Sequence, residues 1–178
     1  IPFLGGADVI SGGVGVGADL VVVGVTDGTI VALKQEDGSV AWEVASSSEV
    51  LAPPQVDGDL VVVQAIDGKL VALNALDGEQ RWSYSMPVPA LTLRGTTTPL
   101  IEGEYVVTGF ANGRFVVLDR ASGLPRLDTR VAVSKGKSDL ERLVDLDGNM
   151  VIEGSNLVAV TYQGNLASFD LVDGKSRW

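Results

Sequence analysis

One segment recurs four times along this chain, and this repeat limits the fold more than any other sequence feature. Each copy places two apolar stretches around an Asp-Gly, Asn-Gly or Gln-Gly pair, whose glycines are Gly28, Gly68, Gly113 and Gly164. The glycines lie 40, 45 and 51 residues apart, and the first spacing matches one four-stranded β-propeller blade. The repeat therefore predicts an all-β propeller with hairpins at these pairs, where a type I′ turn would require positive φ at both central residues.

A second turn follows each repeat and separates the last two strands of each predicted blade. A tryptophan comes four residues after the glycine of this turn in three copies, as Trp42, Trp82 and Trp178, and Leu127 takes that position in the third copy. The pattern predicts one partial propeller over residues 1–178, with blades at about 8–45, 53–85, 99–133 and 150–178. A β-sandwich also uses short strands, but it would not repeat an Asp-Gly turn and a tryptophan at 40-residue intervals.

Charge and composition exclude several classes of function. The net charge is −10, with 13 Lys and Arg against 23 Asp and Glu, which argues against a nucleic-acid partner. The most basic stretch, at residues 134–137, is expected to be a solvated loop. The chain has no Cys and no His, so catalytic triads with histidine, cysteine nucleophiles and the usual zinc sites are excluded.

The ends of the chain suggest a larger assembly. The sequence opens within the strand pattern at Ile1, as though processed or truncated, and it has no apolar run long enough to cross a membrane. Three and a fraction blades would leave two apolar flanks open. We therefore expect either a fragment of a longer protein or two copies that close a ring.

The Asp/Ser-Gly-x-x-x-Trp ends of the blades resemble the tryptophan-docking repeat of quinoprotein-like (PQQ-repeat) propellers, in which the tryptophan packs on the neighbouring blade. Two segments outside the repeat indicate one particular family among these propellers. Leu91-Thr-Leu-Arg-Gly95 and Leu140-Glu-Arg-Leu-Val-Asp-Leu-Asp147 are similar to loops of the BamB family, periplasmic lipoproteins of the outer-membrane β-barrel assembly machinery. Residues 162–166 and 170–174 resemble this family too, so the likeness covers essentially the whole chain.

This resemblance implies an eight-bladed ring, of which the chain holds about half, on the periplasmic face of the outer membrane of a Gram-negative bacterium. It implies a non-catalytic scaffold without cofactor or metal that assists outer-membrane protein assembly. The implied partner is BamA, bound through its periplasmic (POTRA) domains, and unfolded outer-membrane proteins are a second candidate. The lipid anchor of the family is absent from this chain. The partner-binding residues implied by the resemblance are Leu91, Leu93, Arg94, Asp145 and Asp147.

The residues themselves direct attention to the same two loops. The links between predicted blades lengthen from 46–52 to 86–98 and 134–149, and in a propeller such links emerge on one face. Long loops on a rigid scaffold commonly carry recognition, and apolar residues beside an Arg are typical of interface hot spots. We expect Arg94 to form a hydrogen-bonded ion pair with Asp145 or Asp147 that fixes both loops.

Other interpretations remain open at the sequence level. Leu91 and Leu93 could instead fill the gap between the second and third blades. The segment Asp145–Asn149 has a weak likeness to a calcium loop, although a turn fits it better, and Asp57-Gly-Asp59 also predicts a turn. The chain could alternatively belong to a quinone-dependent dehydrogenase, or to a propeller that binds peptides or glycans. A dehydrogenase needs an Asp base, calcium ligands and aromatic stacking over the cofactor, and no such constellation stands out.

Overall fold

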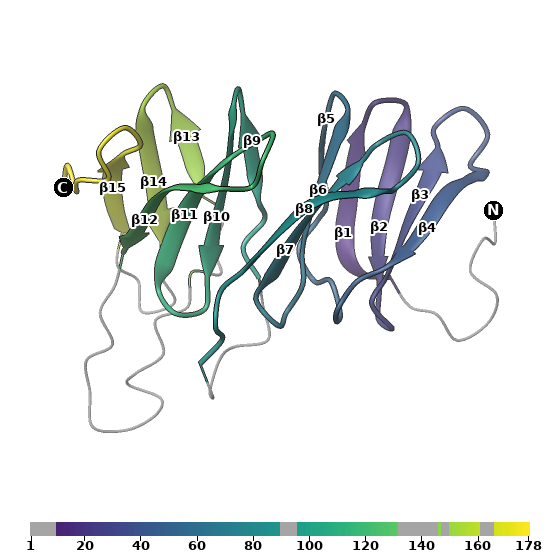
Figure 1. Cartoon of the computed structure of the whole chain (residues 1–178), viewed down its shortest axis with the longest axis horizontal. Helices are drawn as coiled ribbons and strands as arrows, with labels where there is room; N and C mark the ends of the chain where they lie inside the picture. The colour runs from purple at the N-terminus through teal and green to yellow at the C-terminus, as the bar shows by residue number, and fades with distance from the viewer. Residues whose placement is uncertain (1–9, 90–95, 132–145, 147–149, 161–165) are drawn as a thin grey trace. The chain divides into compact units, whose positions relative to one another are not determined.

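The computed structural model describes residues 10–89, 96–131, 146, 150–160 and 166–178, and these form four antiparallel sheets (Figure 1). The first two sheets contain β1 (Ile10–Gly17), β2 (Leu20–Val25), β3 (Thr29–Lys34) and β4 (Val40–Ala45), and then β5 (Gln55–Asp57), β6 (Leu60–Gln64), β7 (Lys69–Asn74) and β8 (Gln80–Ser85). The third sheet contains β9 (Leu100–Glu102), β10 (Tyr105–Phe110), β11 (Arg114–Asp119) and β12 (Pro125–Arg130). The fourth sheet contains β13 (Val151–Glu153), β14 (Asn156–Val160) and β15 (Leu166–Asp170). Each strand pairs with its sequence neighbour, as in propeller blades. The predicted all-β propeller class is confirmed.

The fourth sheet has three strands where the first three have four. An isolated bridge joins Phe169 to Ser176, and the amide of Ser168 donates to the carbonyl of Trp178 at 3.0 Å. Residues 175–178 therefore run beside β15 in the position of an outermost strand, without continuous pairing.

The described hairpin turns, at Gly28, Gly68 and Gly113, differ from the expected type I′, because only the glycine has positive φ. Gly28 has φ of +90° and its amide bonds the carbonyl of Val25 at 2.9 Å, whereas Asp27 is not in the positive-φ region. This geometry is a tight turn followed by a left-handed glycine, the pattern of three-residue hairpin loops. The Asp27 carboxylate instead accepts the Thr29 amide at 2.8 Å, so Asp serves here as a hydrogen-bond acceptor.

Positive φ at two successive residues occurs elsewhere among the described residues, at Ala18 and Asp19 between β1 and β2. The predicted turn at Asp57-Gly58-Asp59 is present between β5 and β6, and Gly58 has φ of +55°.

The chain divides into two compact units, Ile1–Ser85 and Met86–Trp178, hereafter unit 1 and unit 2. The expectation that residues 1–178 form one partial propeller stays a prediction. Within the described ranges, no helix is long and apolar enough to span a membrane.

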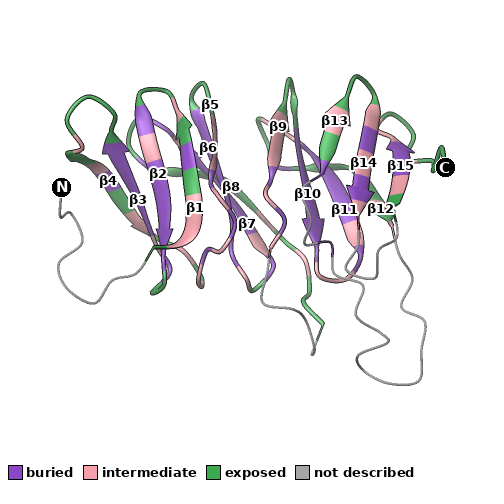
Figure 2. Cartoon of the chain, turned by 180° about the vertical axis from the view of Figure 1, so that it is seen from behind, coloured by how far each residue is buried: buried purple, intermediate pink, exposed green. Residues whose placement is uncertain are grey.

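The core of unit 1 lies between its two sheets. Buried aliphatic side chains of β2, β3, β6 and β7 pack together, and Figure 2 shows these inner strands largely buried. The inner strands are buried at nearly every position, which agrees with their nearly continuous apolar runs.

Trp42 confirms the docking expected for the repeat. Its Nε1 donates to the carbonyl of Ala75 at 2.8 Å, and its ring lies over Gly78, the turn glycine of the next sheet. A Cβ on Gly78 would lie 2.8 Å from Cε3 of the ring, so only glycine fits this close approach.

Unit 2 has a corresponding core between its two sheets. Its buried members include Val107, Phe115 and Val117 from one sheet and Leu157 and Phe169 from the other. The rings of Phe115 and Phe169 are 5.1 Å apart and inclined by 59°, a favourable aromatic arrangement.

Candidate functional site

The five residues predicted to bind a partner lie outside the described residues. Leu91, Leu93 and Arg94 fall in 90–95, and Asp145 and Asp147 fall in 132–145 and 147–149. The predicted ion pair of Arg94, the alternative packing of the two leucines, and the calcium-loop alternative therefore stay predictions. The structure does describe the residues on which both segments are anchored, and these define the candidate site.

The two anchors meet within unit 2. Thr97, three residues after Arg94, is 1% exposed, and its hydroxyl donates to the carbonyl of Leu146. Leu146 lies between Asp145 and Asp147 in the sequence, and its amide donates to the carbonyl of Phe110 at 3.4 Å. The ends of the two predicted loops are thus joined to each other and to the end of β10.

The side chain of Leu146 is part of the apolar core of unit 2, with 2% of it exposed. It packs over Gly109 of β10, where a Cβ would lie 2.9 Å from the Leu146 Cβ and 2.8 Å from the Thr97 hydroxyl oxygen. Glycine at this position therefore leaves the space that both anchors occupy. A buried leucine and a buried hydrogen bond together fix this anchor to the sheet.

Unit 1 contains the same arrangement in a simpler form. Val50, in the link between its two sheets, is fully buried and packs over Gly24 of β2, where a Cβ would lie 2.6 Å from the Val50 Cβ. A backbone bridge also joins Val50 to Ala65. Sequence reasoning missed this aliphatic anchor, although Gly24 and Gly109 occupy the same position of the repeat and could have indicated it.

An ion pair lies at the end of the sheet from which the chain enters the longer predicted loop, residues 134–149. Arg114 Nε donates to Asp128 Oδ1 at 2.6 Å, and its terminal nitrogen donates to the Asp128 carbonyl at 3.3 Å. Val131, the last described residue before 132–145, donates its amide to the carbonyl of Gly113 at 2.8 Å. These bonds lie at the end of β11 that pairs with Phe110, so the chain enters and leaves the longer loop at one end of this sheet.

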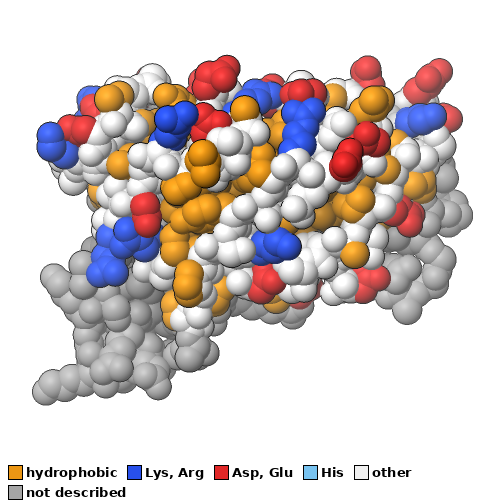
Figure 3. Space-filling view, viewed as in Figure 1, with side chains coloured by type: hydrophobic (Ala, Val, Ile, Leu, Met, Phe, Trp, Pro, Cys, Tyr) orange, Lys and Arg blue, Asp and Glu red, His pale blue; other side chains and the backbone are white. Residues whose placement is uncertain are grey.

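Charged side chains elsewhere on the surface are mixed in sign. On the face drawn in Figure 3, Lys and Arg side chains are scattered, and acidic side chains lie near many of them. Among the described residues, no group of three or more Asp and Glu is arranged to hold a metal ion.

Comparisons with known proteins agree with this architecture. A family profile described as "Outer membrane protein assembly factor BamB" matches residues 4–178. The protein of that name from Alteromonas naphthalenivorans is 39% identical over 97% of this chain and 41% of its own length. The one from Escherichia coli (strain K12) is 41% identical over 95% of this chain and 43% of its own length. The chain therefore spans less than half the length of these relatives.

The crystal structure of BamB from Moraxella catarrhalis superposes with a TM-score of 0.90 at 34% identity, covering 96% of this chain and 53% of that one. The two sequence relatives are named as an assembly factor, which favours the predicted scaffold over the alternative dehydrogenase. The matched family, the shared propeller sheets and the coverage of the whole repeat place this chain in the family of the outer membrane protein assembly factor BamB.

Proposed function

We propose that this chain is part of a non-catalytic scaffold on the periplasmic face of the outer membrane, which binds the POTRA domains of BamA and assists the assembly of outer-membrane proteins. The binding surface consists of Leu91, Leu93, Arg94, Asp145 and Asp147. The name shared by its relatives, outer membrane protein assembly factor, supports the assembly role. The loop anchors support the location of the surface.

The hydrogen bond from Thr97 to Leu146 is the observation that carries this proposal. Arg94 lies three residues before Thr97, so their Cα atoms are at most about 11 Å apart, and Asp145 and Asp147 are bonded neighbours of Leu146, about 3.8 Å away along the chain. Both sets of residues are therefore tethered to one point of unit 2. Such a tether allows the two segments to contribute to one surface.

The residue types suit a protein partner. Two leucines can fill apolar pockets, while the guanidinium of Arg94 can make charge-assisted hydrogen bonds to carboxylates. An Arg that bridges to Asp145 or Asp147 would hold both segments in one conformation before the partner arrives, which reduces the entropy lost on binding.

The proposal is tested by measuring binding of the chain to purified POTRA domains of BamA by biolayer interferometry. Arg94→Glu should weaken binding by roughly 30-fold, the effect of losing an interface hot spot worth about 2 kcal/mol. Thr97→Val, which removes only the hydroxyl that holds Leu146, should weaken binding by a smaller factor.

The matched control is Arg120→Glu, which makes the same charge change in unit 2 at the β11–β12 turn, where Arg120 donates to the carbonyl of Gly103 at 3.3 Å. This variant should bind within about twofold of the parent chain, since its site is remote from the loops. Far-UV circular dichroism must show that the β content of every variant is intact. An unchanged affinity for the Arg94 variant would refute the proposed surface.

A further inference from the structure

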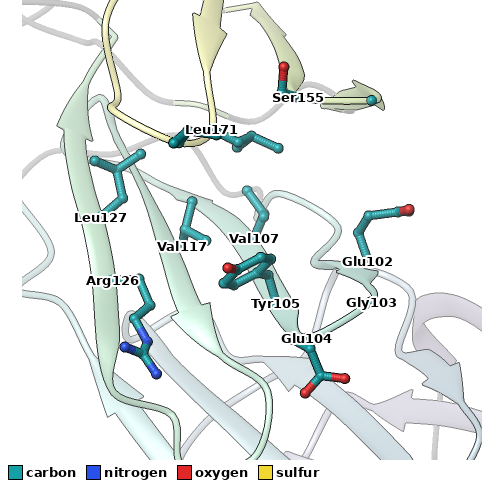
Figure 4. Close-up of a pocket in the computed structure, with 12 residues that line it drawn as sticks. Glu102, Gly103, Glu104, Tyr105, Val107, Val117, Arg126, Leu127, Ser155 and Leu171 are labelled. Atoms are coloured by element: carbon teal, nitrogen blue, oxygen red, sulfur yellow. The ribbon is translucent and has the colours of Figure 1, made fainter.

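Unit 2 contains a cavity of about 660 Å³ at the end of its sheets opposite to the loop anchors. The side chains of Val107, Val117 and Leu127 point toward Leu171, and Tyr105 closes one side (Figure 4). The opening of this cavity, at Tyr105, lies four residues along β10 from Gly109, on which Leu146 packs, a distance of roughly 13 Å. It is a separate feature from the surface proposed above.

The equivalent position in unit 1 explains why the cavity exists. There Trp42 is buried, its ring covers Gly78, and its Nε1 donates to the carbonyl of Ala75. The cavity beside that position measures about 370 Å³. An indole side chain of the chain itself therefore occupies the space between the two sheets of unit 1.

In unit 2 a leucine stands where that indole would be. Leu127 is only half-buried, and it reaches Gly174, where a Cβ would lie 2.6 Å from its Cδ1. It has no N–H to donate to the carbonyl of Leu171, which is the counterpart of Ala75, and it is shorter than an indole. The space beside Leu171 is left open to solvent as a larger cavity.

The rim of this cavity has an apolar lip and an acidic side. Tyr105 is 48% exposed and Val172 is 83% exposed, and both line the opening. Glu102, the last residue of β9, and Glu104, in the turn between β9 and β10, are both exposed. The one basic side chain among the described lining residues, Arg126, donates to Asp119 at 2.8 Å, so its charge is already paired.

We infer that this cavity binds an aromatic side chain, best an indole, from an extended segment of another protein in which a Lys or Arg is adjacent. The aromatic ring lies beside Leu127, against Leu171 and Tyr105, and the adjacent cation faces Glu102 and Glu104. Aromatic rings give large apolar burial with few rotatable bonds, and tryptophan adds the N–H that the Leu171 carbonyl can accept.

The test uses an acetylated and amidated pentapeptide, Gly-Lys-Trp-Lys-Gly, titrated into the chain while the methyl signals of Leu127 and Leu171 are followed by NMR. The peptide should shift both signals with saturation, whereas the same peptide with Ala in place of Trp should bind at least tenfold more weakly. Leu127→Trp should abolish the response, because the chain then fills its own cavity, and its urea midpoint should equal or exceed that of the parent.

Val172 is exposed, so Val172→Lys provides a second variant that should leave the fold intact. It should weaken peptide binding several-fold by removing the apolar lip and repelling the lysines. Leu76→Lys is its matched control, because Leu76 is the exposed counterpart of Val172 in unit 1 and should leave binding unchanged.

Three outcomes would overturn the inference. The first is equal binding of the Trp and Ala peptides, and the second is full peptide binding by the Leu127→Trp chain. The third is a concentration-dependent dimer that the Leu127→Trp change dissolves, since a second copy of the chain would then be the occupant.

Discussion

Replacing Gly78 with Ala would place a methyl group against the indole ring of Trp42. The new Cβ would lie 2.8 and 2.9 Å from Cε3 and Cδ2 of the ring, whereas two carbons pack best at about 3.5–4.0 Å. The ring would have to retreat by roughly 0.6–1.2 Å. Because Nε1 of the same ring donates to the Ala75 carbonyl at 2.8 Å, this movement would also stretch a buried hydrogen bond.

Two terms set the expected loss of stability. Overpacking of this kind costs about 1–3 kcal/mol, and a side chain at the φ of +75° seen for Gly78 costs a further ~1–2 kcal/mol. Gly78→Ala should therefore lower the free energy of unfolding of unit 1 by about 2–5 kcal/mol. Urea denaturation followed by far-UV circular dichroism measures this change. The same substitution is then measured in a chain that already carries Trp42→Ala.

In the Trp42→Ala background the ring is gone, so Gly78→Ala should cost the ~1–2 kcal/mol of backbone strain and a small further amount for Val44, whose Cγ1 would lie 3.1 Å from the new Cβ. The double-mutant cycle should then give a coupling energy of about 1–3 kcal/mol. A coupling below about 0.5 kcal/mol, within the usual error of additivity, would mean that the ring does not rest on this glycine. The docking argument for the whole repeat would then be wrong.

Replacing a glycine inside a strand with alanine normally stabilises a protein by about 0.5–1 kcal/mol. Gly109→Ala and Gly24→Ala should instead destabilise the chain by about 1–3 kcal/mol, because the new Cβ meets Leu146 in the first case and Val50 in the second. A gain of stability in the same urea assay would contradict the packing of Leu146 and Val50 on these glycines. Hydrogen bonds from Arg126 and then Ser122 lower the pKa of Asp119 to about 2, so its stabilising effect is present above the ordinary pKa of 3.8 and is lost as the pH falls toward 2. The difference in urea midpoint between the parent chain and Asp119→Asn should accordingly shrink between pH 5 and pH 2, and a constant difference would contradict this assignment.

The repeat alone was enough to predict the strands and the fold class. Apolar runs such as Leu60–Val63 and the turn glycines recur at blade spacing, and these are local signals that a short stretch of chain carries by itself. The docking of Trp42 was expected from the resemblance of the blade ends to the tryptophan-docking repeat, and not from the periodicity itself. Turn type was the exception, since an Asp side chain that accepts the Thr29 amide favours a left-handed glycine in a three-residue loop over type I′.

Contacts between distant residues required the tertiary structure. The bond from Thr97 to Leu146 joins residues 49 positions apart, and no periodicity of either segment indicates it. The sequence likewise shows that Leu127 replaces a tryptophan, but only packing reveals that neighbouring side chains leave a cavity of about 660 Å³ there. Periodic patterns report which face of a strand is buried, whereas the shape of the space between two sheets depends on every side chain that borders it.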